Sequence, residues 1–274
     1  MSTATALPPE VVRQRMDELV LTWRGSDEDT IRAIRRDSDI VALTVFGLAS
    51  HVYSLAKAVR VLDDADEGPQ IVPLVRQMIE CSVTAMWVEK YGRRAAITLL
   101  REDARGRRNA FETFVKSGLP DDGSVDRWQN ELDVLDPDTS ASSEKFWQRC
   151  EELDGMSGAY AMFRALSGVS HAGSMVVDLY AQPADVTPES PLGVALVAQP
   201  KMWAHDAVRG TGLMYLLLAG MAWDRLDKRH RARTRLKQIA AELGLRLTWS
   251  ESAVGLSRDS DWQRKQRERR RAGP

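Results

Sequence analysis

The stretch that decides the fold is PQIVPLVRQMIECSVTAMWVEKYG, residues 69–92. Its large apolar side chains recur every three or four residues, which places them along one stripe of an α-helix. Pro69 and Pro73 fall in the expected first turn, where proline is tolerated, and Gly92 is expected to end the helix. The stripe consists of Val72, Val75, Ile79, Val83 and Met86.

Helical periodicity continues on both sides of this segment. Upstream, a helix opened by proline is expected over residues 8–25, and a second helix over residues 26–62, where Asp29 follows Ser26 at capping-box spacing. Downstream, a charged helix is expected from Arg93 to Lys116, and an apolar one from Trp203 to Leu226. The sequence therefore predicts an all-α helical bundle. Shorter helices are expected over residues 128–132, 146–153, 160–169 and 236–245.

The chain is expected to carry appendages around one bundle. We assign residues 1–25 to an N-terminal helix, residues 26–228 to the bundle domain, and residues 229–274 to a C-terminal helix with a basic tail. Residues 119–143 are rich in Asp, Ser, Gly and Pro, which is typical of a loop insertion. Residues 175–180 and 194–197 are expected to be extended or irregular, so that this region forms either a small β-hairpin or an irregular insertion.

The composition is that of an ordinary globular protein, with 43% hydrophobic and 28% charged residues. Lys and Arg (38) nearly balance Asp and Glu (39), so no global field attracts nucleic acid or an anionic membrane. No secretory signal pattern is present, and the uncharged residues 40–56 include Ser, Thr and His, which favours a core helix over a bilayer span. We expect a cytoplasmic protein without a membrane partner.

No motif indicates a cofactor. Cys81 and Cys150 are far apart and form no C-x-x-C pair, so reduced thiols are expected. The Glu-x-x-His and His-Glu-x-x-His patterns of helical metal sites do not occur, and neither do the glycine patterns of nucleotide-binding loops. We therefore expect neither a metal nor an organic cofactor.

The first candidate site is the pair Arg164 and His171. On an unbroken helix, seven positions amount to about two turns, so both side chains would lie on one side, ~10 Å apart along the axis. A guanidinium can clamp a phosphate, and an imidazole can accept the proton of an attacking 2′-hydroxyl. The pair thus indicates ribonuclease chemistry without a metal. The structural alternative is that His171 terminates a helix between Gly168 and Gly173 while Arg164 pairs with an acid.

A second candidate pair, Arg76 and Glu80, flanks the apolar stripe and is expected to be half-buried. The two side chains either form an intrahelical ion pair, worth about 0.2–0.5 kcal/mol, or serve a site. In the latter case Arg76 contacts an anionic ligand, and Glu80 orients His171 or His51. Because His51 lies in an apolar segment, we expect it to need a partner inside the bundle, either as a core histidine or in support of catalysis.

A dense basic run occupies the end of the chain, with Glu268 as its only acidic residue. It can neutralise several phosphates of RNA or DNA, although a disordered solubilising tail has the same composition. The only aromatic residue near the run that could stack on a base is Trp262. The basic residues are Arg264, Lys265, Arg267, Arg269, Arg270 and Arg271.

Two segments, Leu74–Glu80 and Tyr160–Ala172, resemble a family of uncharacterised bacterial all-helical proteins that is itself similar to HEPN domains. The resemblance spans residues 40–227. It implies a helical bundle, often dimeric, in which many members cut RNA through an Arg-x4-6-His motif in a composite cleft. It also implies Arg164 and His171 as that motif. Ser167, which lies between them in the sequence, is a further candidate for a support role. The residue after the motif arginine is usually polar in active members, whereas here it is Ala165.

Three functional hypotheses follow. The first is a HEPN-like, metal-independent ribonuclease in defence or stress response, with His171 as general base, Arg164 as phosphate clamp, and Glu80 and Arg76 in support. The second is a non-catalytic homodimerisation module that uses Trp203, Met214 and the glycines of its helix. The third is a bundle that senses a small anion near His51, Glu80 and His171.

Overall fold

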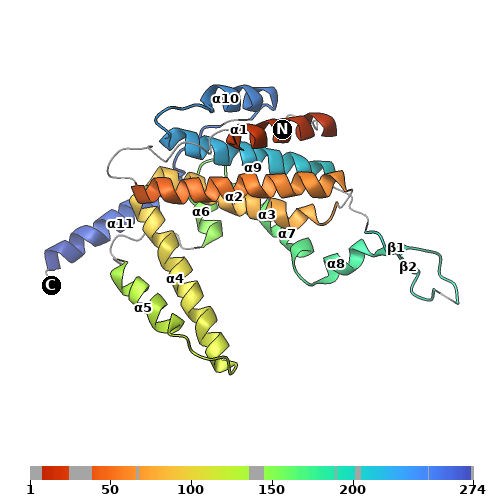
Figure 1. Cartoon of the computed structure of the whole chain (residues 1–274), viewed down its shortest axis with the longest axis horizontal. Helices are drawn as coiled ribbons and strands as arrows, with labels where there is room; N and C mark the ends of the chain where they lie inside the picture. Colours follow the sequence, from red (N-terminus) through yellow and green to blue (C-terminus); the bar gives the residue numbers. More distant parts are fainter. Residues whose placement is uncertain are drawn as a thin grey trace.

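The structure, a computed structural model, describes residues 8–24, 39–65, 68–135, 145–188, 190–200, 205–245 and 247–272. Within these residues the chain forms eleven helices and one antiparallel pair of short strands, an all-α helical bundle with appendages (Figure 1). The elements are α1 (Pro9–Arg24), α2 (Asp39–Asp64), α3 (Ile71–Tyr91), α4 (Arg93–Lys116), α5 (Ser124–Val134), α6 (Phe146–Glu152), α7 (Ser157–Ser170), α8 (Ser174–Leu179), β1 (Ala181–Pro183), β2 (Val194–Leu196), α9 (His205–Leu226), α10 (Arg233–Glu242) and α11 (Ala253–Ala272).

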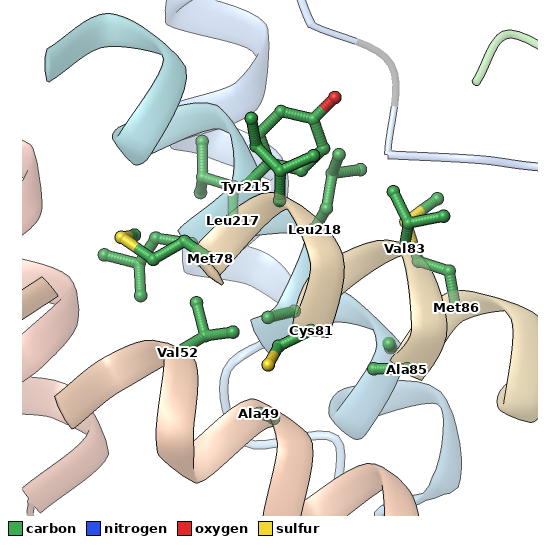
Figure 2. Packing of buried hydrophobic residues seen from close by; sticks show 14 of the residues in the cluster. Ala49, Val52, Met78, Cys81, Val83, Ala85, Met86, Tyr215, Leu217 and Leu218 are labelled. Carbon is green, nitrogen blue, oxygen red and sulfur yellow. The ribbon is translucent and has the colours of Figure 1, made fainter. Parts of the chain in front are cut away.

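Helix α3, formed by the predicted apolar segment, is the centre of the bundle. It packs against α2, α9, α7, α6 and α4, so side chains on every side of it are buried. Figure 2 shows Met78 of this helix between Val52 of α2 and Leu217 of α9, with Val83 and Met86 farther along α3; all five are almost fully buried. The predicted stripe is therefore confirmed, and the buried surface extends well beyond it.

Trp87 is the largest fully buried side chain of this core, and it carries a polar group that needs a partner. Its indole Nε1 donates a hydrogen bond of 2.7 Å to Glu152 Oε2. Glu152, which is also buried, forms an ion pair with Arg258 of α11 at 3.6 Å. Helix α6 and the first turns of α11 are thereby connected to the middle of the bundle.

Two glycines of α9 allow it to approach its neighbours closely. A Cβ atom at Gly220 would lie 2.4 Å from Tyr53 Oη, and one at Gly212 would lie 3.4 Å from a methyl group of Val75. Both glycines are buried inside the bundle. The glycine-bearing face of α9 is therefore covered by α2 and α3, and the hypothesis that it mediates self-association is wrong at these two positions. Met214 packs partly buried against the same core.

Most predicted helices are confirmed with small shifts at their ends. Gly92 ends α3 with a φ of 69°, a conformation that favours glycine, and α4 begins at the next residue. The short helix predicted near residue 128 is longer than expected, since α5 packs along α4 inside the predicted loop insertion. The predicted start of the second helix near Ser26, and Trp203, lie outside the described residues.

A small β-hairpin is present, but its first strand does not lie where the sequence predicted it. Residues 174–179 form helix α8 instead of an extended segment, and the first strand is β1, which pairs with β2 so that Ala181 lies opposite Leu196. The apolar run in residues 174–179 (SMVVDL) is too short for its periodicity to distinguish a helix from a strand.

Three appendages project from the bundle in different directions (Figure 1). The α4–α5 pair extends to one side, α8 with the β-hairpin forms one end of the molecule, and α11 leaves at the opposite end. The basic C-terminal run predicted as a tail is helical through Ala272.

By length and composition, α2 and α3 are long and apolar enough to cross a membrane. The same property is found in core helices of soluble proteins, and most of α3 is buried by other helices of the bundle.

The close contact at Gly220 gives a test of the packing. We expect Gly220→Ala to destabilise the protein by about 1–3 kcal/mol, because the new methyl group overlaps the buried Tyr53 hydroxyl. Gly47→Ala is the matched control, since Gly47 also lies within a helix but a methyl group added to it would have no neighbouring atom within 4 Å. That variant should gain about 0.5–1 kcal/mol from helix propensity. Urea unfolding followed by circular dichroism measures both; equal effects would contradict the packing described here.

Candidate functional site

Arg76 of α3 is held against α7 by two contacts. Its Nε donates a hydrogen bond of 2.8 Å to Ser167 Oγ, and its guanidinium carbon lies 4.1 Å from the centre of the Phe163 ring. Ser167 Oγ in turn donates to the carbonyl oxygen of Phe163 at 2.7 Å. Phe163 and Ser167 are four residues apart, so both fall on the face of α7 that meets α3. Two of the predicted site residues, Arg76 and Ser167, are therefore in direct contact.

Arg76 also lacks a carboxylate partner among the described residues, although it is half-buried. The alternative of an ion pair with Glu80 is not formed, because the guanidinium turns toward Phe163 and Ser167 instead. Other half-buried arginines are paired, for example Arg209 with Asp63 and Arg225 with Glu89. Arg76 thus presents positive charge at the α3–α7 contact that no described acidic group neutralises.

Arg164 follows Phe163 on α7 and is exposed. Within the part of the chain that the structure describes, it makes no hydrogen bond or ion pair, so the predicted alternative of an acidic partner is not observed there. Arg76 on α3 and Arg164 on α7 are thus two guanidiniums without a carboxylate partner among the described residues, and no described contact joins them to each other.

His171 is exposed and lies just beyond the end of α7. The helix ends at Ser170, and His171 has extended backbone angles, φ −123° and ψ 153°. The assumption of an unbroken helix from Arg164 to His171 is thus wrong at its last residue. The chain then turns back, and Met175 of α8 packs so tightly on α7 that a Cβ at Gly168 would lie 2.1 Å from its sulfur. The position of His171 is therefore set by the turn between α7 and α8, and not by its spacing from Arg164 along a helix.

Glu80 is half-buried on α3 and has no hydrogen bond or ion pair with any described residue. Its charge contributes to raising the pKa of the thiols of Cys81 and, on α6, Cys150. No described contact joins Glu80 to His171 or His51. Its support of His171 stays a prediction.

His51 lies on the exposed side of α2, so the expectation that it needs a partner inside the bundle is wrong. Other positions form the buried stripe of this helix. Some of the apolar residues near His51 in the sequence face the core, but His51 itself does not. Its support role stays a prediction. The buried positions include Val45, Ala49, Val52, Ala56 and Val59.

The basic C-terminal residues belong to α11, far from α7 in Figure 1. Arg264, Lys265 and Arg267 have exposed side chains. Within the described residues, no group of three or more His, Cys, Asp or Glu side chains is arranged to hold a metal ion.

Phe163 and the exposed apolar surface next to the site were not predicted from the sequence. The sequence feature that could have indicated Phe163 is its position four residues before Ser167, which places both side chains on the same face of the helix. The exposed side chains at the corner are Met162, Met175, Val177 and Tyr180, each between 38% and 65% accessible. Nothing in their sequence pattern separates them from core residues, because both groups have helical spacing.

Both cysteines are buried, and their chemistry is suppressed by that burial. Desolvation raises the pKa of Cys81 to about 11 and that of Cys150 to about 12, above the usual value near 9. The thiolate is the reactive form of cysteine, so neither residue suits nucleophilic catalysis near neutral pH.

Comparisons with known proteins give one family. A model of a family of unknown function, DUF5677, matches residues 42–185, which are more than half of the 274 residues. This range contains α3, α7, α8 and β1, and therefore all the residues of the site around Arg76. No curated protein and no solved structure matches the chain significantly.

Thiol labelling tests the burial of the two cysteines. In the folded protein at pH 8, we expect alkylation of both at least about a hundredfold slower than in denaturant, since the raised pKa of each thiol lowers its thiolate population by about that factor. Mass spectrometry after brief exposure to iodoacetamide measures this. Rapid labelling of either cysteine in the native protein would show that its surroundings are open to solvent.

Proposed function

The chain belongs to DUF5677, a family of unknown function, and we propose that it is a HEPN-like, metal-independent endoribonuclease. The observation that carries the proposal is the charge arrangement at the α3–α7 contact. Arg76, fixed by Ser167 and Phe163, and exposed Arg164 have no carboxylate partners among the described residues, and exposed His171 follows at the end of the same helix. Guanidiniums without carboxylate partners and an exposed imidazole on the same helix supply the groups that cleavage of a phosphodiester needs, and we propose that they converge on one substrate.

In the proposed reaction, neutral His171 accepts the proton of a ribose 2′-hydroxyl. The 2′-oxygen then forms a bond to phosphorus, and the bond from phosphorus to the 5′-oxygen of the next nucleotide breaks. The departing 5′-oxygen takes a proton from water or from a second imidazole. Arg164 and Arg76 stabilise the negative charge that develops on the phosphoryl oxygens. The products carry a 2′,3′-cyclic phosphate and a 5′-hydroxyl.

We further propose that two copies of the chain form the site together. One chain provides a single histidine at this corner, and the exposed apolar side chains Met162, Met175, Val177 and Tyr180 border Arg164 and His171 along the chain. Contiguous exposed apolar side chains mark interaction surfaces. A second copy placed on this surface would cover them and would supply the second imidazole. We also propose that the protein acts in the cytoplasm, where its proposed substrate, cellular RNA, is available.

RNA cleavage in chelator is the decisive experiment. We expect purified protein to cut cellular RNA and to leave cyclic phosphate ends, and His171→Ala to lower the rate by about 10²–10⁴, because a general base contributes a factor of this order. Added imidazole should partly restore the His171→Ala variant. Arg164→Ala should also impair cleavage, with unchanged helical circular dichroism.

Arg93→Ala is the control for Arg164→Ala. Arg93 is likewise exposed, makes no described ion pair and lies at the start of α4, so its removal should leave the rate unchanged. Cleavage that persists in His171→Ala would remove His171 from the mechanism. If the parent protein is a dimer and still leaves the RNA intact, the enzymatic proposal is refuted.

A second candidate function, a non-catalytic self-association module, is favoured by the β-hairpin appendage. Its side chains Leu192 and Leu196 are 87% and 88% accessible, and Val186 is 76% accessible. Such exposure of large apolar groups on a projecting hairpin costs solubility unless a partner covers them. In this case association through α8 and the hairpin would be the whole activity.

Self-association can be tested at this appendage. We expect the parent chain to sediment as a dimer and the double variant Leu192→Asp, Leu196→Asp to sediment as a monomer, because charges would be buried in the interface. Leu43→Asp is the control, as Leu43 is also exposed (64%) but lies on α2. A monomeric parent would contradict both the composite site and the module. Dimers without any RNA cleavage would favour the module alone.

A further inference from the structure

Helix α11 has two halves with different surroundings, and the first half is fixed to the bundle. Arg258 pairs with Glu151 at 2.8 Å, and Arg94 of α4 pairs with Asp259. A Cβ at Gly255 would lie 2.4 Å from Tyr91 Oη, so the first turn of α11 lies directly on the end of α3. The direction of the helix is therefore set by the bundle.

The second half, from Gln263 to Arg271, projects away from the bundle (Figure 1). The hydrogen bonds and ion pairs described for its side chains stay within α11, as for Arg264 with Asp261 and Arg267 with the carbonyl of Gln263. Arg264, Lys265 and Arg267 are exposed. Helical structure persists here although like charges repel, and the helix dipole favours cations at this C-terminal end.

The composition of this half restricts the kind of partner. Residues 263–271 are QRKQRERRR and include no apolar side chain. A helix that docks in a protein groove or lies in a membrane interface needs an apolar face, which this segment lacks. At about 100° per residue, its basic positions fall on all sides of the helix. A partner recognised by charge alone, such as the phosphate backbone of a nucleic acid, matches this distribution.

Trp262, the aromatic residue that precedes the run, is already engaged. The guanidinium carbon of Arg94 lies 4.3 Å from the centre of its ring. Binders of single strands combine cations with aromatic rings on which bases stack. With Trp262 occupied and no aromatic residue in residues 263–272, the projecting half can contact phosphates but has no stacking platform.

We propose that the projecting half of α11 binds the phosphate backbone of double-stranded RNA without reading its sequence. Over the run from Arg264 to Arg271 the helix rises about 12 Å. A duplex presents roughly one phosphate per 1.7 Å of axis, so its charge density is comparable to that of the run. The choice of RNA over DNA rests on the proposed ribonuclease activity. The proposed contact between α11 and phosphates does not depend on that activity.

The test measures binding without cleavage. Full-length chain carrying His171→Ala is titrated in chelator into a fluorescent blunt-ended RNA duplex, and the dissociation constant is followed against salt concentration. The triple variant Arg264→Gln, Lys265→Gln, Arg267→Gln should bind about a hundredfold more weakly at ~0.1 M salt, with a salt slope smaller by about three. The triple variant Lys57→Gln, Lys228→Gln, Lys237→Gln removes the same charge at exposed positions elsewhere and should bind like the parent.

The outcomes separate this proposal from the enzymatic one. Retained duplex binding with no RNA cleavage in the unmutated chain would reject the ribonuclease proposal and leave the α11 contact in place. If both triple variants lose the same affinity for the duplex, the contact at α11 is overturned, because the total charge of the chain would then explain the binding. Much tighter binding to the single strand than to the duplex would overturn it as well. So would binding to phosphatidylserine vesicles with no binding to the duplex.

Discussion

The structure depends on the burial of α3, a helix that is apolar on nearly every side. Such a helix is unstable in water unless other helices cover it completely, and this requirement brings α2, α9, α7 and α6 around it. The close approach of α9 at Gly212 and Gly220 belongs to the same constraint, since a larger residue there would separate the helices. The bonds from Trp87 to Glu152 and from Glu152 to Arg258 satisfy the polar groups that this burial would otherwise leave without partners.

The candidate site is a consequence of how α7 meets α3. The guanidinium of Arg76 lies at the edge of the buried surface, where the Phe163 ring covers one of its faces and Ser167 accepts one of its hydrogen bonds. These contacts orient the charge of Arg76 without neutralising it. An anion bound there would gain from a cation whose side-chain position is already fixed, because little conformational entropy is lost on binding.

Arginines in this chain perform two different tasks. Arg60, Arg149 and Arg258 pair with carboxylates of other helices and so join helices to one another. Among the described residues, Arg76, Arg164 and the exposed Arg264 and Arg267 of α11 form no ion pair with another helix. The near-zero net charge of the whole chain conceals this division, since paired and unpaired arginines count equally in a sum. The proposals of RNA binding therefore rest on local basic patches. A chain with so little net charge can attract a polyanion only through such patches.

The sequence by itself determined the all-α class, the ends of α3 at its prolines and at Gly92, and the chemical types of the candidate residues, because helical periodicity and capping are local properties. It also proposed Arg76 and Ser167, which the structure brings into contact. The exposure of His51, the turn before His171, the helical form of residues 174–179 and the partner of Arg76 were decided only by the tertiary structure. Each depends on which neighbouring helix covers a given face, and that arises from packing between segments far apart in the chain, which no local pattern encodes.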